Sequence, residues 1–154
     1  MKDRATIICC REDKILLVAR ARARWSLPGG IIKRSESPLD AARRELEEET
    51  SLVGADFQYL FQFGGVNKRH FVFYVDFARD ASPKPQNEIS RCRWFNPAKI
   101  STLAISIPTR EIVTTFSSNK KRGETSSAVV GELSGWPWTN ASHGHSPGTA
   151  SQSD

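Results

Sequence analysis

Five short segments, rich in apolar and β-branched residues and bounded by polar or Gly-containing turns, predict β-strands. They are Ala5–Cys10, Lys14–Arg20, Phe57–Phe63, His70–Phe77 and Glu88–Phe95. In the fourth segment, apolar and more polar residues alternate, so one face of this strand is expected to be apolar. His70 lies on the other face, and we expect it to be a surface strand residue rather than a catalyst.

After Ser37, apolar residues recur with a period near 3.6 instead of two, and this change predicts an α-helix. Leu39, Ala42 and Leu46 recur at the spacing of one helix face and form an apolar stripe. Ser37 is a good N-cap residue, and Pro38 suits the first helical position because it needs no amide hydrogen there. The segment should therefore be an amphipathic helix that begins at Pro38.

A second helix is expected after Pro108, from about Thr109 to Phe116, with apolar residues facing inward. From Ser117 onward the composition shifts to Ser, Gly, Thr, Asn and Pro, with few residues suited to a core. We therefore expect one domain over residues 1–116 and a low-complexity, disordered tail over residues 117–154.

Two features of the tail stand out from its polar background. The segment Trp136-Pro137-Trp138 is apolar enough to dock on the domain or on a partner. His143 and His145 could bind a metal ion adventitiously, but no further ligand pattern accompanies them.

Composition indicates a basic, reduced, non-membrane protein. The 154 residues carry a formal net charge of +5, and all of this excess lies in residues 1–116 because the charges of the tail cancel. Cys9, Cys10 and Cys92 have no framework spacing, so free thiols and a cytoplasmic location are expected, with Cys9 and Cys10 packing on opposite strand faces. No signal peptide or membrane-spanning stretch is expected.

The polar face of the first helix is strongly acidic. Glu45, Glu48 and Glu49 are three and four positions apart, which places their carboxylates on one face. Glu36 precedes the helix and can return toward that face through a loop. A Glu-rich run alone is more often a solvated helix face, but crowded carboxylates are also the oxygen ligands that Mg²⁺ prefers.

The spacing around this helix favours the metal-binding interpretation. Gly30 is followed after five residues by Glu36, and after seven more by Arg44-Glu45-Leu46-Glu47-Glu48-Glu49. This pattern, over Gly30–Leu52, resembles the Nudix box of the Nudix hydrolase family. One position departs, because the family usually has Gly where this chain has Ser51. Ser in a left-handed helix terminus should cost up to about 1 kcal/mol of stability but removes no ligand.

The resemblance implies an α/β/α sandwich in which a mixed β-sheet lies between helices. It also implies hydrolysis of a nucleoside diphosphate linked to another moiety, with Mg²⁺ as cofactor and Mn²⁺ able to substitute. The implied metal ligands are Glu45, Glu48 and Glu49, with Glu36, Glu88 or the Gly30 carbonyl completing the shell. Either Glu45 or Glu88 is the expected general base, and Arg44 is expected to pair with a carboxylate of the box and position it.

Arginine recurs at every second position in the segment Arg20-Ala-Arg22-Ala-Arg24-Trp25, which would place three guanidinium groups on one side of an extended chain. A solvated edge or loop explains this pattern as well as a phosphate clamp does. If it is a clamp, proximity to the box favours Arg20 or Arg24. Trp25 either packs in the core or walls the substrate pocket, and the sequence does not decide between these roles.

Substrate identity is not readable from the sequence. The signatures that the ADP-ribose and dinucleoside-polyphosphate branches of the family tend to carry after the box are absent, which leaves a nucleoside triphosphate as the default and nucleotide sugars or capped RNA as alternatives. A non-catalytic nucleotide sensor and an RNA 5′-end protein are the rival functions. Nucleic acid is not the expected partner, because a modest positive charge is weak evidence for it. The family resemblance favours a homodimer.

Overall fold

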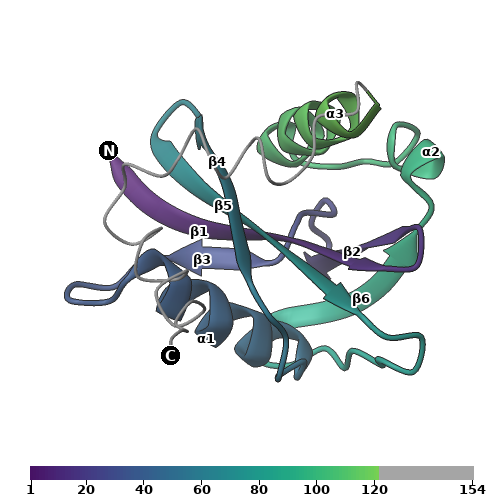
Figure 1. Cartoon of the computed structure of the whole chain (residues 1–154), viewed down its shortest axis with the longest axis horizontal. Coiled ribbons are helices and arrows are strands. Elements are labelled where there is room, and N and C mark those ends of the chain that lie inside the picture. The colour runs from purple at the N-terminus through teal and green to yellow at the C-terminus, as the bar shows by residue number, and fades with distance from the viewer. Residues whose placement is uncertain (122–154) are drawn as a thin grey trace, which may run out of the picture.

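A computed structural model describes residues 1–121. In chain order, the elements are β1 (Lys2–Arg11), β2 (Lys14–Arg20), β3 (Gly29–Ile31), α1 (Pro38–Thr50), β4 (Gln58–Gly64), β5 (Lys68–Phe77), β6 (Ile89–Phe95), α2 (Pro97–Ile100) and α3 (Ile107–Lys121) (Figure 1). All five predicted strands are present, with ends that differ by a few residues. The predictions for Trp136-Pro137-Trp138, His143 and His145 concern residues outside the described range.

The strands form one mixed sheet in the order β4-β5-β1-β2-β6, with β3 paired to β1 off this path. The central strand β1 runs parallel to β5 over its whole length and antiparallel to its other two neighbours. Those two neighbours share one edge of β1. The pair Arg4↔Ile31 joins its N-terminal part to β3, whereas Cys10↔Ile15 joins its C-terminal end to β2.

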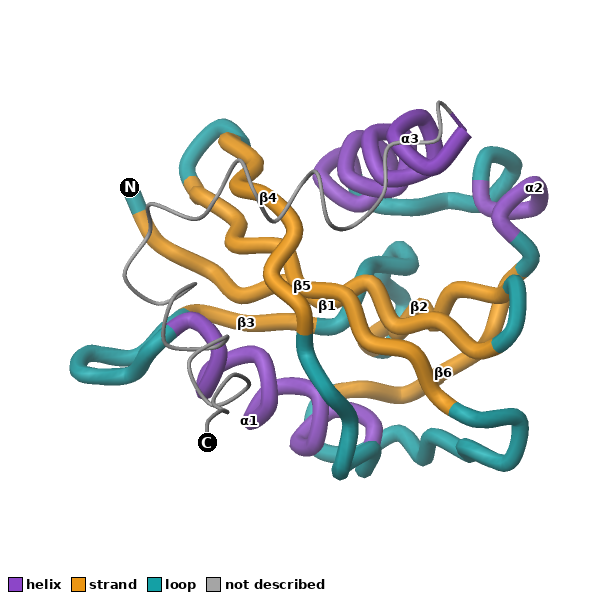
Figure 2. Tube along the Cα trace, viewed as in Figure 1, coloured by secondary structure: helices purple, strands orange, loops and turns teal. Residues whose placement is uncertain are grey.

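Helices cover both faces of this sheet, as Figure 2 shows. On one face, Ala42 and Leu46 of α1 pack with β1 and β5 residues in a buried apolar cluster. On the other face, Ile112 and Val113 of α3 belong to a second cluster. The predicted α/β/α sandwich is confirmed. Cys9 lies in the first cluster and Cys10 in the second, so the prediction that they pack on opposite faces is also correct.

The start and end of α1 follow from local chemistry. The Ser37 hydroxyl accepts the Asp40 amide hydrogen bond at 3.0 Å, and Pro38 is the first helical residue, as predicted. Ser51 ends the helix with φ 67°, and its amide donates to the Glu47 carbonyl at 2.9 Å. Ser therefore occupies the left-handed conformation that favours glycine, so the predicted strain of up to about 1 kcal/mol applies here.

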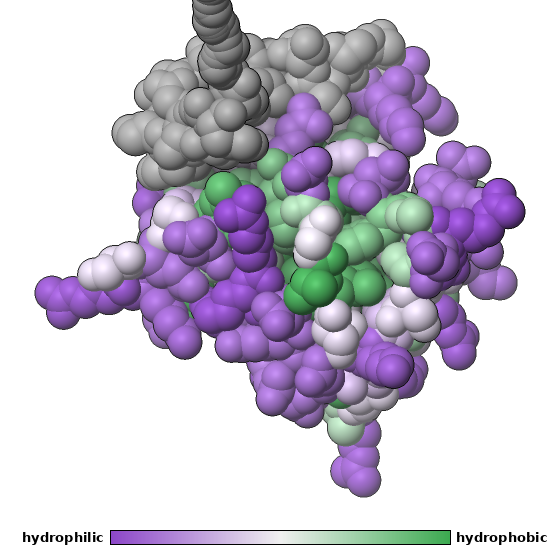
Figure 3. All heavy atoms as spheres, turned by 60° about the horizontal axis from the view of Figure 1, so that its bottom comes forward, coloured by the Kyte–Doolittle hydropathy of each residue, from purple (hydrophilic) through white to green (hydrophobic). Residues whose placement is uncertain are grey.

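One face of the molecule is mainly polar (Figure 3). The face that Figure 3 brings forward is mostly hydrophilic, with a smaller hydrophobic area near its middle. Within residues 1–121, no helix combines the length and the apolar composition that crossing a membrane requires.

The predicted end of the last helix is wrong, and one short helix was not predicted. Helix α3 continues past Phe116 to Lys121, so the tail that composition placed from Ser117 begins inside a helix. The residues after Phe116 are polar, and two lysines in the last turn favour helix continuation by interacting with the negative end of the helix dipole. The one-turn helix α2, which the Asn96 side chain caps, was not among the predicted helices.

The prediction for His70 is also wrong, because this residue is buried. It is 5% exposed, and its Nδ1 atom lies 2.9 Å from the Thr6 hydroxyl. Alternation along a strand predicts an exposed face only when one side of the sheet meets solvent. Here α3 and its preceding loop cover the second face, so β5 is buried on both sides over most of its length.

His70 should make the stability of the protein sensitive to acid. Burial is the main reason why the pKa of His70 is lowered from 6.5 to about 4, and the positive charges of Arg4 and Lys68 contribute to the same shift. Between these pKa values, the unfolded chain therefore binds a proton at His70 that the folded chain does not bind. The contribution of neutral His70 to the unfolding free energy is complete above pH 6.5 and is lost as the pH falls toward 4. Between pH 7 and pH 5, the wild type should lose about 2 kcal/mol more unfolding free energy than His70→Gln. Urea unfolding at both pH values measures this, and equal losses would contradict the prediction.

Candidate active site

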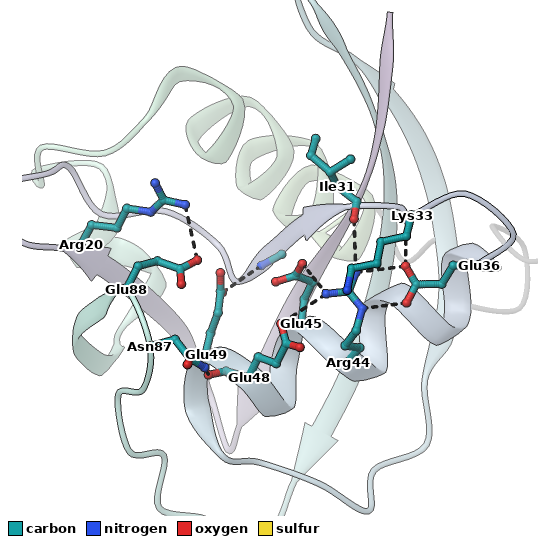
Figure 4. Close-up of polar contacts among 11 residues, drawn as sticks. Arg20, Ile31, Lys33, Glu36, Arg44, Glu45, Glu48, Glu49, Asn87 and Glu88 are labelled. Atoms are coloured by element: carbon teal, nitrogen blue, oxygen red, sulfur yellow. Dashed lines mark hydrogen bonds and ion pairs between the residues drawn. The ribbon is translucent and has the colours of Figure 1, made fainter.

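Helix α1 presents three glutamate side chains on one face, as its period predicted (Figure 4). Their exposure decreases toward the sheet, because the Glu48 side chain is 49% exposed, that of Glu45 is 13% exposed and Glu49 is 6% exposed. The apolar stripe of Leu46 and its neighbours packs on the sheet and fixes this orientation. The helix therefore holds a graded row of carboxylates that runs from solvent into the interior.

Two glycines allow β3 to approach this row closely. A Cβ atom on Gly30 would lie 2.1 Å from Oε2 of Glu45, so the absence of a side chain leaves room for that carboxylate. At Gly29 a Cβ atom would lie 2.2 Å from the Ala5 carbonyl oxygen of β1. The Gly29 amide donates to Oε1 of Glu49 at 3.2 Å. The backbone of β3 thus forms one wall of the site.

Arg44 connects several of the carboxylates, as Figure 4 shows. Its Nε and Nη2 atoms donate to the two oxygens of Glu36 at 2.7 and 3.0 Å. Its Nη1 atom donates to Glu45 at 2.9 Å and to Glu48 at 3.2 Å, and Nη2 also reaches the Ile31 carbonyl at 3.2 Å. The predicted pairing of Arg44 with the box is therefore present. Hydrogen bonds from Arg44 are also the main reason why the pKa of Glu36 is lowered.

Glu49 is the most buried of these carboxylates. Burial raises its pKa to about 7, and the neighbouring negative charges of Glu45 and Glu88 act in the same direction. The amide of Gly29 and the charge of Arg4 oppose this rise but do not cancel it. The negative charge of Glu49 is thus incompletely balanced by the protein, a condition that a bound cation would relieve.

Glu88 joins the site from the turn immediately before β6. Its Oε2 atom lies 3.5 Å from a guanidinium nitrogen of Arg20, and its side chain is 51% exposed. The preceding loop is fastened to the end of α1, because Asn87 Nδ2 donates to the Glu48 carbonyl at 2.7 Å and the Gln86 amide to the Glu49 carbonyl at 3.2 Å. Carbonyls that the helix leaves unpaired therefore hold Glu88 next to Glu49.

The comparison with known proteins identifies the family. The model of the NUDIX domain matches residues 1–116. The chain belongs to the Nudix family. A solved structure of a Nudix hydrolase family member from Chromobacterium violaceum has a TM-score of 0.73 at 27% identity and covers 94% of each chain. The NUDIX domain of Shewanella oneidensis NrtR, solved with ADP-ribose, has a TM-score of 0.69 at 18% identity, with 77% of this chain and 88% of that one covered, which shows the fold alone.

Curated relatives of this Nudix chain include two enzymes named for different substrates. The RNA pyrophosphohydrolase of Bartonella henselae is 34% identical over 77 residues, and the diphosphoinositol polyphosphate phosphohydrolase 2 of Rattus norvegicus is 36% identical over 74 residues. The matches cover 50% and 45% of this chain, and 37% and 41% of those relatives. The chain thus spans well under half the length of either relative.

The arginine segment does not adopt the extended conformation that would align its side chains. Strand β2 ends at Arg20, and Arg22 has φ 60° in a turn. Arg24 is exposed, and Arg20 pairs with Glu88. Trp25 packs edge-on against Phe95 with ring centroids 5.0 Å apart. The structure therefore brings Arg20 to the acidic site, while the substrate-binding roles of Arg24 and Trp25 stay predictions.

Arg4 was not predicted as a site residue, and it lies on β1 opposite Ile31 of β3. Glu49 and then Glu45 are the charges that most strongly favour its protonated form, whereas burial is the largest influence and lowers its pKa. Arg4 therefore lies within electrostatic reach of the deepest carboxylates of the Nudix box. One sequence pattern could have identified Arg4. Polar residues occupy every second position, Lys2, Arg4 and Thr6, at the start of an otherwise apolar strand.

The residues of the site suit a hard divalent cation in their chemistry. The carboxylates of Glu45, Glu48 and Glu49 and the backbone of Gly30 offer the oxygen donors that Mg²⁺ and Mn²⁺ accept. Within residues 1–121, no three acidic, His or Cys side chains already converge in a ligand cluster, because Arg44 engages Glu45 and Glu48. Glu49 is 6% exposed and forms no ion pair within residues 1–121, and this buried, unpaired carboxylate is the observation that supports a cation here.

Substitution of Gly30 tests the close contact between β3 and α1. Gly30→Ala should lower the free energy of unfolding by about 1–3 kcal/mol, because its Cβ atom would displace a carboxylate that Arg44 holds in place. Gly64→Ala is the matched control, since its Cβ atom would meet nothing within 4 Å. Denaturant unfolding measures both variants. Equal stabilities of the two variants would show that Glu45 does not lie against Gly30.

Proposed function

We propose that this Nudix chain is an Mg²⁺-dependent hydrolase that cleaves the phosphoanhydride bond of a diphosphate linked to another moiety. The observation that carries the proposal is the row of Glu45, Glu48 and Glu49 beside the Gly30 backbone, with Arg44 holding two of the carboxylates. The NUDIX match over residues 1–116 and the pyrophosphohydrolase names of the relatives support it. Every box carboxylate is retained, which disfavours a purely sensory module.

The proposed metal ligands are Glu45, Glu48 and Glu49, with the Gly30 carbonyl beside them. When bound, Mg²⁺ or Mn²⁺ would neutralise charge on the diphosphate and activate water for attack. Glu36 is a weaker candidate than the sequence suggested, because Arg44 bonds to both its oxygens and the Lys33 amide donates to one of them at 2.9 Å. We assign Glu36 and Arg44 to positioning, since together they restrain the carboxylate of Glu45.

Glu88 is the proposed general base, in preference to Glu45. The carboxylate of Glu45 is largely buried and hydrogen-bonded by Arg44, whereas Glu88 is half exposed and has one long contact with Arg20. A base must have a free oxygen that can take a proton from the attacking water. Contacts from Gln86 and Asn87 to α1 hold the loop, and Glu88 with it, close to the carboxylate row of the helix.

Several substrate classes contain the proposed scissile bond. A nucleoside triphosphate is the default that sequence analysis favoured, while the names of the relatives point to the 5′ end of RNA and to diphosphoinositol polyphosphates. A phosphate-release screen with Mg²⁺ over these classes, with ADP-ribose and nucleotide sugars included, would assign the activity. Absence of metal-dependent turnover across the whole screen would contradict the proposal.

The proposed metal-binding role of Glu48 can be tested with the neighbouring Glu47 as a control. Glu48→Gln should lower Mg²⁺-dependent turnover by about 100-fold or more, because an amide is a weaker ligand than a carboxylate. Its thermal stability should be unchanged or higher, since an exposed charge is removed from a crowded acidic face. Glu47→Gln, at an exposed position outside the carboxylate row, should keep full activity. A Glu48→Gln variant with normal turnover would refute the metal assignment.

The base assignment makes a different kinetic prediction. Glu88→Gln should lower kcat by about 100-fold, the usual range for loss of a general base, while KM and Mn²⁺ affinity change little. Asp80→Asn, an exposed carboxylate in the loop before β6, serves as the control. Steady-state kinetics and Mn²⁺ titration followed by electron paramagnetic resonance provide the two readouts. If Mn²⁺ affinity falls in parallel with kcat, Glu88 is a ligand instead of the base.

A further inference from the structure

A cavity of about 310 Å³ lies on the α3 face of the sheet. Residues of β1, β5, the connection between β2 and β3, and the start of α3 line it, and they include Arg4, Thr6, Lys68 and His70. In the parallel register, Arg4 is opposite His70, so these four side chains come from adjacent parts of two paired strands. None of the active-site carboxylates of α1 lines the cavity.

The charges of this cavity are of one sign. Arg4 is half-buried and Lys68 is exposed, and neither forms an ion pair with any residue in the range 1–121. No aspartate or glutamate is among the described residues that line the cavity. Two unpaired cations around a small cavity favour an anionic occupant, because burying a guanidinium without a partner is costly.

Hydrogen-bonding groups complete the lining. The cavity includes the hydroxyl-bearing residues Thr6, Ser26 and Ser106, as well as Thr109 in the first turn of α3. His70 is deeply buried, and its Nδ1 atom lies 2.9 Å from the Thr6 hydroxyl. The N-terminal end of a helix adds a partial positive charge to the same region. These groups suit phosphate oxygens, which accept several hydrogen bonds at once.

The cavity adjoins the proposed catalytic site through Arg4. This residue lines the cavity, and Glu49 and then Glu45 are the charges that most strongly favour its protonated form. The Gly29 amide connects the two regions again, because it donates to Glu49 while Gly29 pairs with Thr6 of β1. A substrate whose anhydride lies at the carboxylate row could therefore extend another group into the cavity.

We propose that this cavity binds a phosphate monoester carried on the non-cleaved part of the substrate, with Arg4 and Lys68 as the residues that determine this specificity. The inference rests on the proposed hydrolase function. A nucleobase fits the described lining poorly, because Phe, Tyr and Trp are absent from it and no large aromatic surface is available for stacking. The substrate class is then a diphosphate on a phosphorylated polyol or sugar.

Binding without metal tests the cavity independently of catalysis. Inositol hexakisphosphate serves as the probe, titrated calorimetrically into the full chain in the presence of a chelator. Arg4→Gln and Lys68→Gln should each weaken its binding by about tenfold, as expected for loss of one charge-assisted contact. Lys14→Gln, an exposed residue at the start of β2, should bind like the wild type. Lys68 is on the surface, so its variant answers the question even if Arg4→Gln fails to fold.

Steady-state kinetics then test whether the cavity contributes to substrate binding. With a diphosphoinositol polyphosphate, Arg4→Gln and Lys68→Gln should raise KM about tenfold and leave kcat within about twofold. With a nucleoside triphosphate, which lacks the additional phosphate monoesters, KM should change less than about twofold in the same variants. Equal KM changes for both substrates would overturn the proposal, as would wild-type affinity of both variants for inositol hexakisphosphate.

Two further outcomes separate the alternatives. If an RNA oligonucleotide with a 5′-phosphate loses affinity in both variants while inositol hexakisphosphate does not bind the wild type, the cavity recognises a nucleic-acid backbone and the proposal is wrong. If no substrate is turned over, but the two variants still lose affinity for inositol hexakisphosphate and Glu48→Gln does not, the phosphate cavity is supported and the hydrolase function is what fails.

Discussion

The hydrogen bonds of Arg44 are the interaction on which the site depends. One guanidinium contacts Glu36 in the loop before α1, Glu45 and Glu48 on the helix, and the Ile31 carbonyl of β3. Three carboxylates so close together would repel one another without a cation between them. Arg44 therefore neutralises part of the acidic face and also fastens the loop and β3 to α1. A metal site built on this helix would form around a cation that is already present.

A backbone constraint complements this electrostatic one. The edge of β1 is shared by β2 and β3, and Gly29 and Gly30 bring β3 close to both the Ala5 carbonyl and the carboxylate of Glu45. The site is thereby acidic on the α1 face of the sheet, while Arg4 and the cavity behind it are basic on the α3 face. This arrangement suits a substrate with several phosphates, because the carboxylates on one side would hold the proposed metal ions at the anhydride and the other side offers Arg4 and Lys68.

Much of the acidic site could be predicted from local sequence. The start of α1, the common face of its glutamates and the left-handed end at Ser51 follow from capping chemistry, helical period and a single substituted position. The pairing of Arg44 with the box followed from the motif. Arg4 and the Asn87 contact were missed, because each acts through a partner about 40 or more positions away in the sequence. Local patterns carry no information about such distant neighbours.

The sequence by itself determined the family and the order and type of the five longer strands and of the helices α1 and α3. Tertiary structure alone decided which strand faces are buried, where α3 ends and which cations face a cavity. His70 shows the reason: alternation identifies two faces of β5, but burial depends on whether another element covers each face, and α3 covers the second one. Periodicity is a property of neighbouring residues, whereas burial and charge pairing depend on residues that only folding brings together.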